Sequence, residues 1–242
     1  MRIRFLGYLA AAGAVLAMFS CATFPAALYE RDASLQAALA KPPAYPDVRF
    51  AVLSDPHLMD PALWGEGAAI EAYLREDRKL LRESSDILEE AVHLLKELPA
   101  DLVLVPGDLT KDGERSSHLL MAERLRAIEA AGKKVFVICG NHDVLNREAF
   151  RYDGEARIPV DSVSPEEFAE IFAEFGYGEA LNRDPASLSY VAEPLPGLQI
   201  LALDGCLYRE KPIDGHSPAG GRFSEATLHW IDAILAAAAV AG

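Results

Sequence analysis

Short apolar runs alternate with longer amphipathic stretches between residues 47 and 139. The runs over 48–54, 102–106 and 135–139 are mainly apolar and too short for helices, so each predicts a buried strand. Between them, residues 68–98 and 114–131 carry apolar residues at helical spacing, with a break expected near Ser84-Ser85. The order strand, helix, strand, helix, strand predicts a parallel sheet that is covered on both faces and has right-handed crossovers.

Each of the two helical stretches has a set of apolar positions that recur with the helical period. In the first stretch they are Ile87, Ala91, Leu94 and Leu98. In the second they are Met121, Leu125 and Ile128, and Gly132 is expected to end the helix.

The pattern becomes mixed further along the chain. Ser164-Pro165-Glu166-Glu167 predicts a helix start with a capping box. Residues 187–192 and 198–203 are expected to be strands joined by a turn at 194–197, and a last helix is expected from about Ser224. The sequence as a whole indicates an α/β fold, a layered sandwich of β-sheet flanked by helices.

The N-terminal pattern is that of an exported protein. Arg2 and Arg4 precede an apolar run over 5–19 that ends at Ser20-Cys21-Ala22, which is typical of a signal peptide over residues 1–20. Cys21 resembles the lipidated cysteine of bacterial lipoproteins, which implies membrane attachment through a lipid in the periplasm or at the cell surface. Residues 21–46, rich in proline near their end, are expected to form a tether, and residues 47–242 the folded domain.

The composition is that of a globular protein and argues against one class of partner. Of the 242 residues, 51% are hydrophobic and 25% charged, and the formal net charge of −14 comes from interleaved acids and bases. Binding to duplex nucleic acid is not expected, because it depends on a basic surface.

Polar groups capable of binding metal follow each of the three predicted parallel strands. They are Asp55-Pro56-His57, Gly107-Asp108 and Gly140-Asn141-His142-Asp143. Each motif alone is weak, and the Asp112-Gly113 pair that follows the second is typical of a turn. Because ligands of open α/β sheets bind beyond the carboxyl ends of the strands, we expect the three motifs to converge. Carboxylate and amide oxygens with imidazole suit manganese, iron or zinc.

These motifs, in this order, resemble those of the calcineurin-like metallophosphoesterases. The stretch from Gly107 to Glu114 is similar to the bacterial branch that includes cyclic-nucleotide phosphodiesterase-like proteins. The resemblance implies two divalent metal ions and hydrolysis of a phosphomonoester or phosphodiester, with a phosphate-ester small molecule or nucleotide as substrate.

The resemblance also implies a role for each motif residue. Asp55 and His57 would hold one metal ion, Asp108 would bridge both, and Asn141 would hold the second. His142 would act as a catalytic acid or phosphate stabiliser, with Asp143 orienting its ring. Two ions bridged in this way can clamp the attacking and leaving oxygens of an in-line displacement.

The family pattern also includes a later histidine and a Gly-His-x-His motif, which this sequence lacks, so the chain is expected to be truncated before them. Surface positions are expected for His93 and His118, a loop position for His216 and a structural role for His229. The absence motivates an alternative: a non-catalytic surface lipoprotein, or an inactive fragment, that keeps the phosphoesterase scaffold.

Two smaller questions concern cysteines and substrate choice. Cys139 and Cys206 are expected to be small buried hydrophobes, because their spacing is not that of metal ligands. Substrate choice is expected to depend on the loops over 60–68 and 146–163. There Trp64 and Tyr152 could stack on a base, although loop aromatics more often pack locally.

Overall fold

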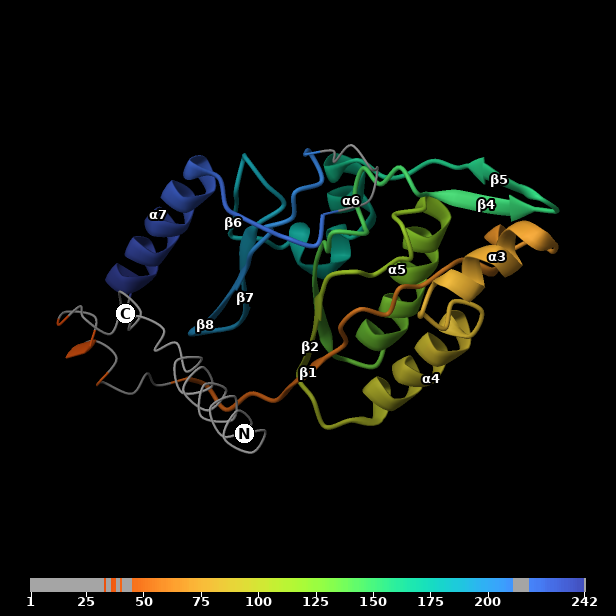
Figure 1. Cartoon of the computed structure of the whole chain (residues 1–242). Coiled ribbons are helices and arrows are strands. Elements are labelled where there is room, and N and C mark those ends of the chain that lie inside the picture. The colour runs from red at the N-terminus through yellow and green to blue at the C-terminus, as the bar shows by residue number, and fades with distance from the viewer. Residues whose placement is uncertain (1–32, 34–35, 38–39, 41–44, 211–217, 242) are drawn as a thin grey trace, which may run out of the picture. The chain divides into compact units, whose positions relative to one another are not determined.

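The computed structural model describes residues 33, 36–37, 40, 45–210 and 218–241 (Figure 1). The chain divides into two units, residues 1–44 and 45–242, and every element named below belongs to the second. The predicted signal segment, Cys21 and His216 lie outside the described residues. Among the helices that the structure describes, none combines the length and the apolarity needed to cross a membrane.

A three-stranded parallel sheet, in the order β1-β2-β3, confirms the predicted alternation of strands and helices. Its strands are β1 (Phe50–Val52), β2 (Leu102–Pro106) and β3 (Lys134–Ile138). Val103 of the central strand pairs with Ala51 on one side and Val135 on the other. All three strands therefore end at the same edge, where the predicted motifs follow.

Three helices connect these strands: α3 (Ala68–Glu76), α4 (Ser84–Glu97) and α5 (Arg115–Glu129). The predicted break separates α3 from α4. The buried face of α5 includes Met121, Leu125 and Ile128, as the periodicity predicts. In α4, however, the core side chains are Leu88, Val92 and Leu95, whereas Ile87 and Leu94 are more than half exposed. Two apolar stripes run along this helix, and periodicity alone could not show which of them faces the sheet.

The region predicted as a loop over 146–163 contains an antiparallel hairpin, β4 (Phe150–Asp153) and β5 (Ala156–Pro159). It packs near the short helix η2 (Pro61–Leu63) and α3. Tyr152 is buried there with Met59 and Ile70, and Trp64 packs against the same cluster. The two loop aromatics thus pack locally.

A second, antiparallel sheet in the order β6-β7-β8 lies on the side of the parallel sheet opposite α4 and α5 (Figure 1). Its strands are β6 (Asn182–Arg183), β7 (Tyr190–Leu195) and β8 (Leu198–Ala202), and the buried Tyr190 hydroxyl donates to the Val137 carbonyl of β3 at 2.8 Å. The remaining elements are α6 (Pro165–Ile171), η3 (Ala173–Tyr177) and α7 (Glu225–Ala241). Ser164 and Glu167 form the predicted capping box of α6.

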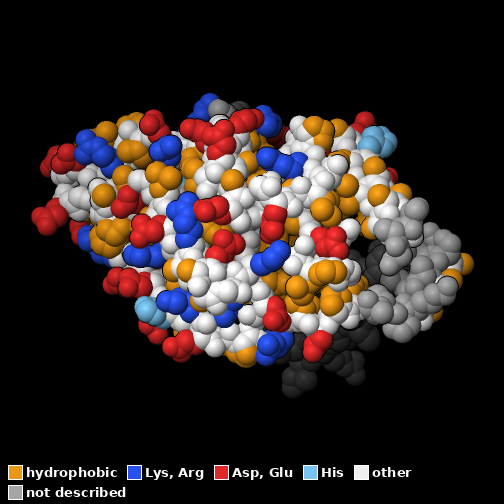
Figure 2. Space-filling view, turned by 180° about the vertical axis from the view of Figure 1, so that it is seen from behind, with side chains coloured by type: hydrophobic (Ala, Val, Ile, Leu, Met, Phe, Trp, Pro, Cys, Tyr) orange, Lys and Arg blue, Asp and Glu red, His pale blue; other side chains and the backbone are white. Residues whose placement is uncertain are grey.

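The surface carries both signs of charge. Figure 2 shows lysine and arginine side chains interspersed with aspartate and glutamate over the face seen there. On this face the basic side chains do not gather into a continuous patch.

Candidate metal centre

The loops that follow β1 and β2 are bound to each other by their backbones. The His57 N–H donates to the Asp108 carbonyl at 3.0 Å, and the Leu58 N–H donates to the Leu109 carbonyl at 3.0 Å. This pairing continues the parallel register beyond the strands and carries the first two motifs side by side.

Glycine makes the approach of the second and third motifs possible. A Cβ atom on Gly140 would lie 2.1 Å from Asp108 Oδ1, and one on Gly107 would lie 2.8 Å from the Gly140 backbone. Gly107 also has a φ of 103°, which side-chain-bearing residues rarely adopt. The two motif glycines therefore let Asp108 and the Gly140–His142 turn come into contact.

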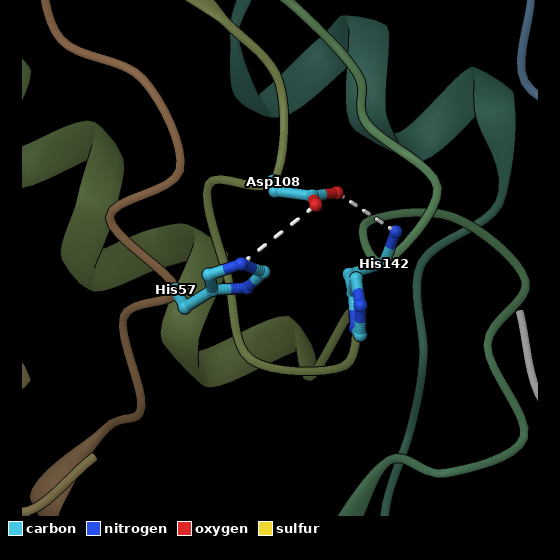
Figure 3. A group of neighbouring side chains, drawn as sticks. All are labelled: His57, Asp108 and His142. Atoms are coloured by element: carbon cyan, nitrogen blue, oxygen red, sulfur yellow. Dashed lines mark hydrogen bonds and ion pairs between the residues drawn. The ribbon is translucent and has the colours of Figure 1, made fainter. Parts of the chain in front are cut away.

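His57, Asp108 and His142 meet where the three loops converge (Figure 3). One ligand-type atom from each lies within 4.8 Å of the other two. His57 Nε2 is 3.7 Å from Asp108 Oδ2, and the His142 backbone N–H donates to Asp108 Oδ1 at 3.1 Å. The structure thus brings together one residue from each of the three predicted motifs.

The backbone at these positions is strained. Among the described residues, four non-glycine residues have positive φ, and three of them are Asp55, His57 and Asp108, with values of 54°, 42° and 48°. A left-handed conformation costs a side-chain-bearing residue roughly 1–2 kcal/mol. Such strain clusters at functional sites, where the surrounding structure enforces it.

The other two predicted metal ligands, Asp55 and Asn141, do not belong to this group of three residues. Asp55 is exposed, although its charge acts on His57. Asn141 is half-buried between Gly140 and His142. Their roles as ligands stay predictions.

The His142 ring is oriented by Asp112, which corrects the role predicted for Asp143. His142 Nδ1 is 2.9 Å from Asp112 Oδ1, and Asn146 Nδ2 donates to the same carboxylate oxygen at 3.3 Å. Burial alone would lower the pKa of His142, but the hydrogen bond to Asp112 and its charge raise that pKa overall.

Asp143 instead ties the motif loops together. Its buried carboxylate accepts hydrogen bonds from the backbone N–H groups of Leu109, Thr110 and Gly140 at 3.1, 2.9 and 2.8 Å. These bonds occupy both of its oxygens. Asp143 therefore fixes the backbone of the site, whereas the ring contact belongs to Asp112.

Asp112 is part of a buried charged network that sequence reasoning missed, because Asp112-Gly113 was interpreted as a turn. Lys111 is fully buried, is paired with Asp112 and lies 3.6 Å from Glu114 Oε1. Its ammonium also lies over the Tyr73 ring at 4.4 Å from the centroid. Three charged residues within four positions after a strand-end motif are the sequence signal that could have revealed this network.

The pKa values of two site carboxylates shift in opposite directions because their neighbours differ. Burial raises the pKa of Asp108 above its ordinary value, and the charge of Asp143 adds to this. Burial would also raise the pKa of Asp112, but the His142 hydrogen bond and Lys111 lower it overall.

The remaining histidines occupy different environments. His118 is fully buried, which corrects its predicted surface position; its Nε2 lies 2.8 Å from the Asp143 carbonyl, and its ring packs edge-on against Phe168. His93 is exposed as predicted, and His229 is exposed on α7. His118 supports the loop that carries Asp143.

The two domain cysteines lie close together despite their distant positions in the sequence. Cys139, Cys206 and Asp204 have ligand-type atoms within 4.8 Å of one another, and both thiols are free. Cys139 is buried as predicted, whereas Cys206 is half-buried. The Asp204 carboxylate accepts hydrogen bonds from two backbone N–H groups and the Tyr208 hydroxyl, so it is held in a structural role.

The residues at the convergence of the loops fit a divalent metal ion. His57 Nδ1 is buried and has no hydrogen-bond partner among the described residues. Burial lowers the pKa of His57, with the charge of Lys79 adding to the effect, so the ring is held in the neutral form that binds metals. Imidazole and carboxylate donors within one small group match the preferences of zinc, manganese and iron.

Comparisons with known proteins identify the fold and the family of this chain. The crystal structure of a dimetal phosphatase from Danio rerio superposes with a TM-score of 0.50 at 20% sequence identity, which shows a shared fold. The match covers 80% of this chain and 66% of the other, just under two thirds of its length. The comparison with curated proteins gave no match. The model of the calcineurin-like phosphoesterase family matches residues 48–216, so the chain belongs to this family.

Proposed function

We propose that this chain hydrolyses phosphate esters with two divalent metal ions bound at the carboxyl edge of its parallel sheet. The observation that carries the proposal is the meeting of His57, Asp108 and His142, which lie on three separate loops. The backbones of His57 and Asp108 are held in the left-handed conformation. Membership of the calcineurin-like phosphoesterase family supports it.

The metal-binding roles follow from the donor atoms. His57 and Asp55 would hold one ion, Asp108 would bridge both, and Asn141 would hold the other. Divalent ions bound there would supply Lewis acidity toward the phosphoryl group and a lowered pKa for a water molecule. Burial raises the pKa of Asp108, and bound cations would lower it, because they favour the ionised carboxylate.

His142 would serve as the acid that protonates the leaving-group oxygen. Because Asp112 occupies its Nδ1, the Nε2 atom is left for the substrate. The pKa of His142, raised by the Asp112 hydrogen bond and charge against the effect of burial, favours the protonated ring that a general acid needs. Asp143 acts one step further away, by fixing the Gly140 and Leu109 backbones on either side of the site.

Substrate and location are finer proposals. The likeness of the Gly107–Glu114 stretch to cyclic-nucleotide phosphodiesterase-like proteins favours a small phosphate ester or nucleotide. The signal-like segment over 1–20 and Cys21 favour export and lipid attachment. Sequence pattern and resemblance support these proposals.

Metal-dependent turnover by matched variants tests the function. The purified chain loaded with manganese should hydrolyse 4-nitrophenyl phosphate, and Asp108→Asn should lower kcat/KM by about 100- to 1000-fold, because it removes the charge at the centre of the group. Asp101→Asn, which removes an exposed carboxylate from the opposite edge of the sheet, should change it by less than about twofold. Manganese binding without any turnover would contradict the proposal.

A further inference from the structure

Lys79 lies between two cavities that border the candidate metal centre. One cavity, of about 330 Å³, is lined by Asp55, His57 and Lys79. The other, of about 560 Å³, is lined by Asp112, His142 and Lys79. A single lysine thus borders the space beside the predicted metal ligands and the space beside the predicted acid.

Its position is set by the segment that joins α3 to α4. Asp77 ends α3, and its Oδ1 accepts the Lys79 backbone N–H at 2.9 Å. Its Oδ2 accepts the Tyr73 hydroxyl at 2.9 Å, and the Tyr73 ring lies under the buried Lys111 ammonium. The Lys79 backbone is therefore anchored to the same buried network that orients His142.

The charge of the Lys79 ammonium acts on Asp77, whose pKa it helps to lower, and on the site histidine His57. Within residues 45–210 and 218–241, no carboxylate lies within 4.0 Å of it, whereas nearby Arg82 pairs with Glu71 at 2.5 Å. Its positive charge adds to the burial that lowers the pKa of His57, and it acts against the Asp112 hydrogen bond that raises the pKa of His142 overall. A half-buried cation that acts on both histidines is placed to meet an anion between them.

We propose that Lys79 binds a non-bridging phosphoryl oxygen of the substrate, and that it thereby favours dianionic phosphomonoesters over monoanionic phosphodiesters. This inference rests on the proposed phosphoesterase function. A lysine ammonium is a compact point charge with three donors, and its attraction to a phosphoryl group grows with the charge of that group. The preference for monoesters follows from this difference in charge.

Binding of inorganic phosphate tests the inference without any catalytic readout. Isothermal titration calorimetry on the manganese-loaded protein should show that Lys79→Gln weakens phosphate binding by about tenfold or more, the usual effect of losing a charged hydrogen bond. Lys79→Arg should recover much of the affinity. Arg78→Gln, which removes an adjacent exposed cation bordering only the cavity beside His142, should change the affinity by less than about twofold.

A loss of affinity as large in Arg78→Gln as in Lys79→Gln would overturn the inference, because it would reveal a general field effect. Unchanged phosphate affinity in Lys79→Gln would overturn it as well. Lys79 lies on a connecting segment, so Lys79→Gln should unfold at the same temperature as the wild type. A thermal unfolding scan of both proteins checks this.

Kinetics with two substrates test the preference itself. With Lys79→Gln, kcat/KM for 4-nitrophenyl phosphate should fall about tenfold further than kcat/KM for bis(4-nitrophenyl) phosphate. Equal losses for the two would refute the proposed selectivity. A wild-type protein that hydrolyses neither ester would count against the proposed function instead, and the phosphate titration would still decide whether Lys79 binds the anion.

Discussion

The two ends of the parallel sheet both carry charged side chains and a cavity, yet they differ in how those charges are held. At the amino end, Arg49 and Asp101 form an ion pair whose side chains are 64% and 43% exposed, beside a cavity of about 450 Å³. At the carboxyl end, the side chains of His57 and Asp108 are only 15% and 14% exposed, and both residues have positive φ.

The difference shows which features identify a functional edge. Exposed ion pairs cost little and contribute little, so evolution can place them anywhere on a surface. Buried charges and left-handed non-glycine residues each cost free energy, and they persist where other interactions enforce them. Charged side chains and cavities occur at both ends of the sheet. The carboxyl end is therefore distinguished by its buried charges and left-handed residues, which cost free energy.

Removing one lysine from each end should produce the largest contrast in stability. Lys111→Met leaves the buried carboxylates of Asp112 and Glu114 without their cation, and we expect a loss of about 3–5 kcal/mol in the free energy of unfolding. Lys134→Met breaks only the exposed pair with Glu179, and should cost less than about 1 kcal/mol. Urea unfolding at neutral pH measures both.

A second variant separates the electrostatic cause from a packing cause. If the loss in Lys111→Met arises from uncompensated carboxylates, adding Glu114→Gln should recover part of the stability, because it removes one of those charges. An additive loss in the double variant would instead indicate that contacts of the lysine side chain, such as that of its ammonium with the Tyr73 ring, provide the stability.

The next contrast concerns catalysis and compares two aspartates. Asp112→Asn removes the charge that raises the pKa of His142, so the ring should lose its proton at lower pH. We expect kcat/KM for 4-nitrophenyl phosphate to fall about 10- to 100-fold, and the alkaline limb of its pH profile to move toward lower pH. Asp101→Asn should leave the limb in place. An equal loss of rate with an unmoved limb would show that Asp112 acts by packing alone.

The sequence was sufficient to predict the parts of this edge that depend on local order. Apolar runs located β1, β2 and β3, and the rule for parallel sheets then placed the three motifs at one edge. The glycines before Asp108 and Asn141 also have a local signal, since they stand directly between a strand and a polar motif. These features require only spacing and residue type.

The predictions that were wrong concern features that depend on contacts between distant segments. Whether Asp112 or Asp143 faces the His142 ring is decided by the folding of the Gly107–Glu114 loop against a segment about thirty residues away. The side of α4 that faces the sheet and the burial of His118 are likewise set by what packs against each helix. Helical periodicity could not separate a buried histidine from an exposed one.

The smallest expected effect is the contribution of His118 to the pH dependence of stability. Burial lowers the pKa of His118 below its ordinary 6.5, so the folded protein keeps this ring neutral while the unfolded chain binds a proton near that value. The stability that the neutral ring contributes is therefore present above about pH 6.5 and is lost as the pH falls below it, by at most about 1.4 kcal/mol per pH unit.

Comparison with a surface histidine isolates this contribution. Between about pH 7.5 and about pH 5.5, His118→Gln should lose less stability than the wild type, because glutamine does not titrate while its amide N–H can still donate to the Asp143 carbonyl. His93→Gln, at an exposed position of α4, should follow the wild-type curve. If His118→Gln and His93→Gln lose stability in parallel with the wild type, His118 must be able to accept a proton in the folded state. The contact between His118 and Phe168 would then rearrange to accommodate a charged ring, and the residues that support Asp143 would be less rigid than the metal-site loops.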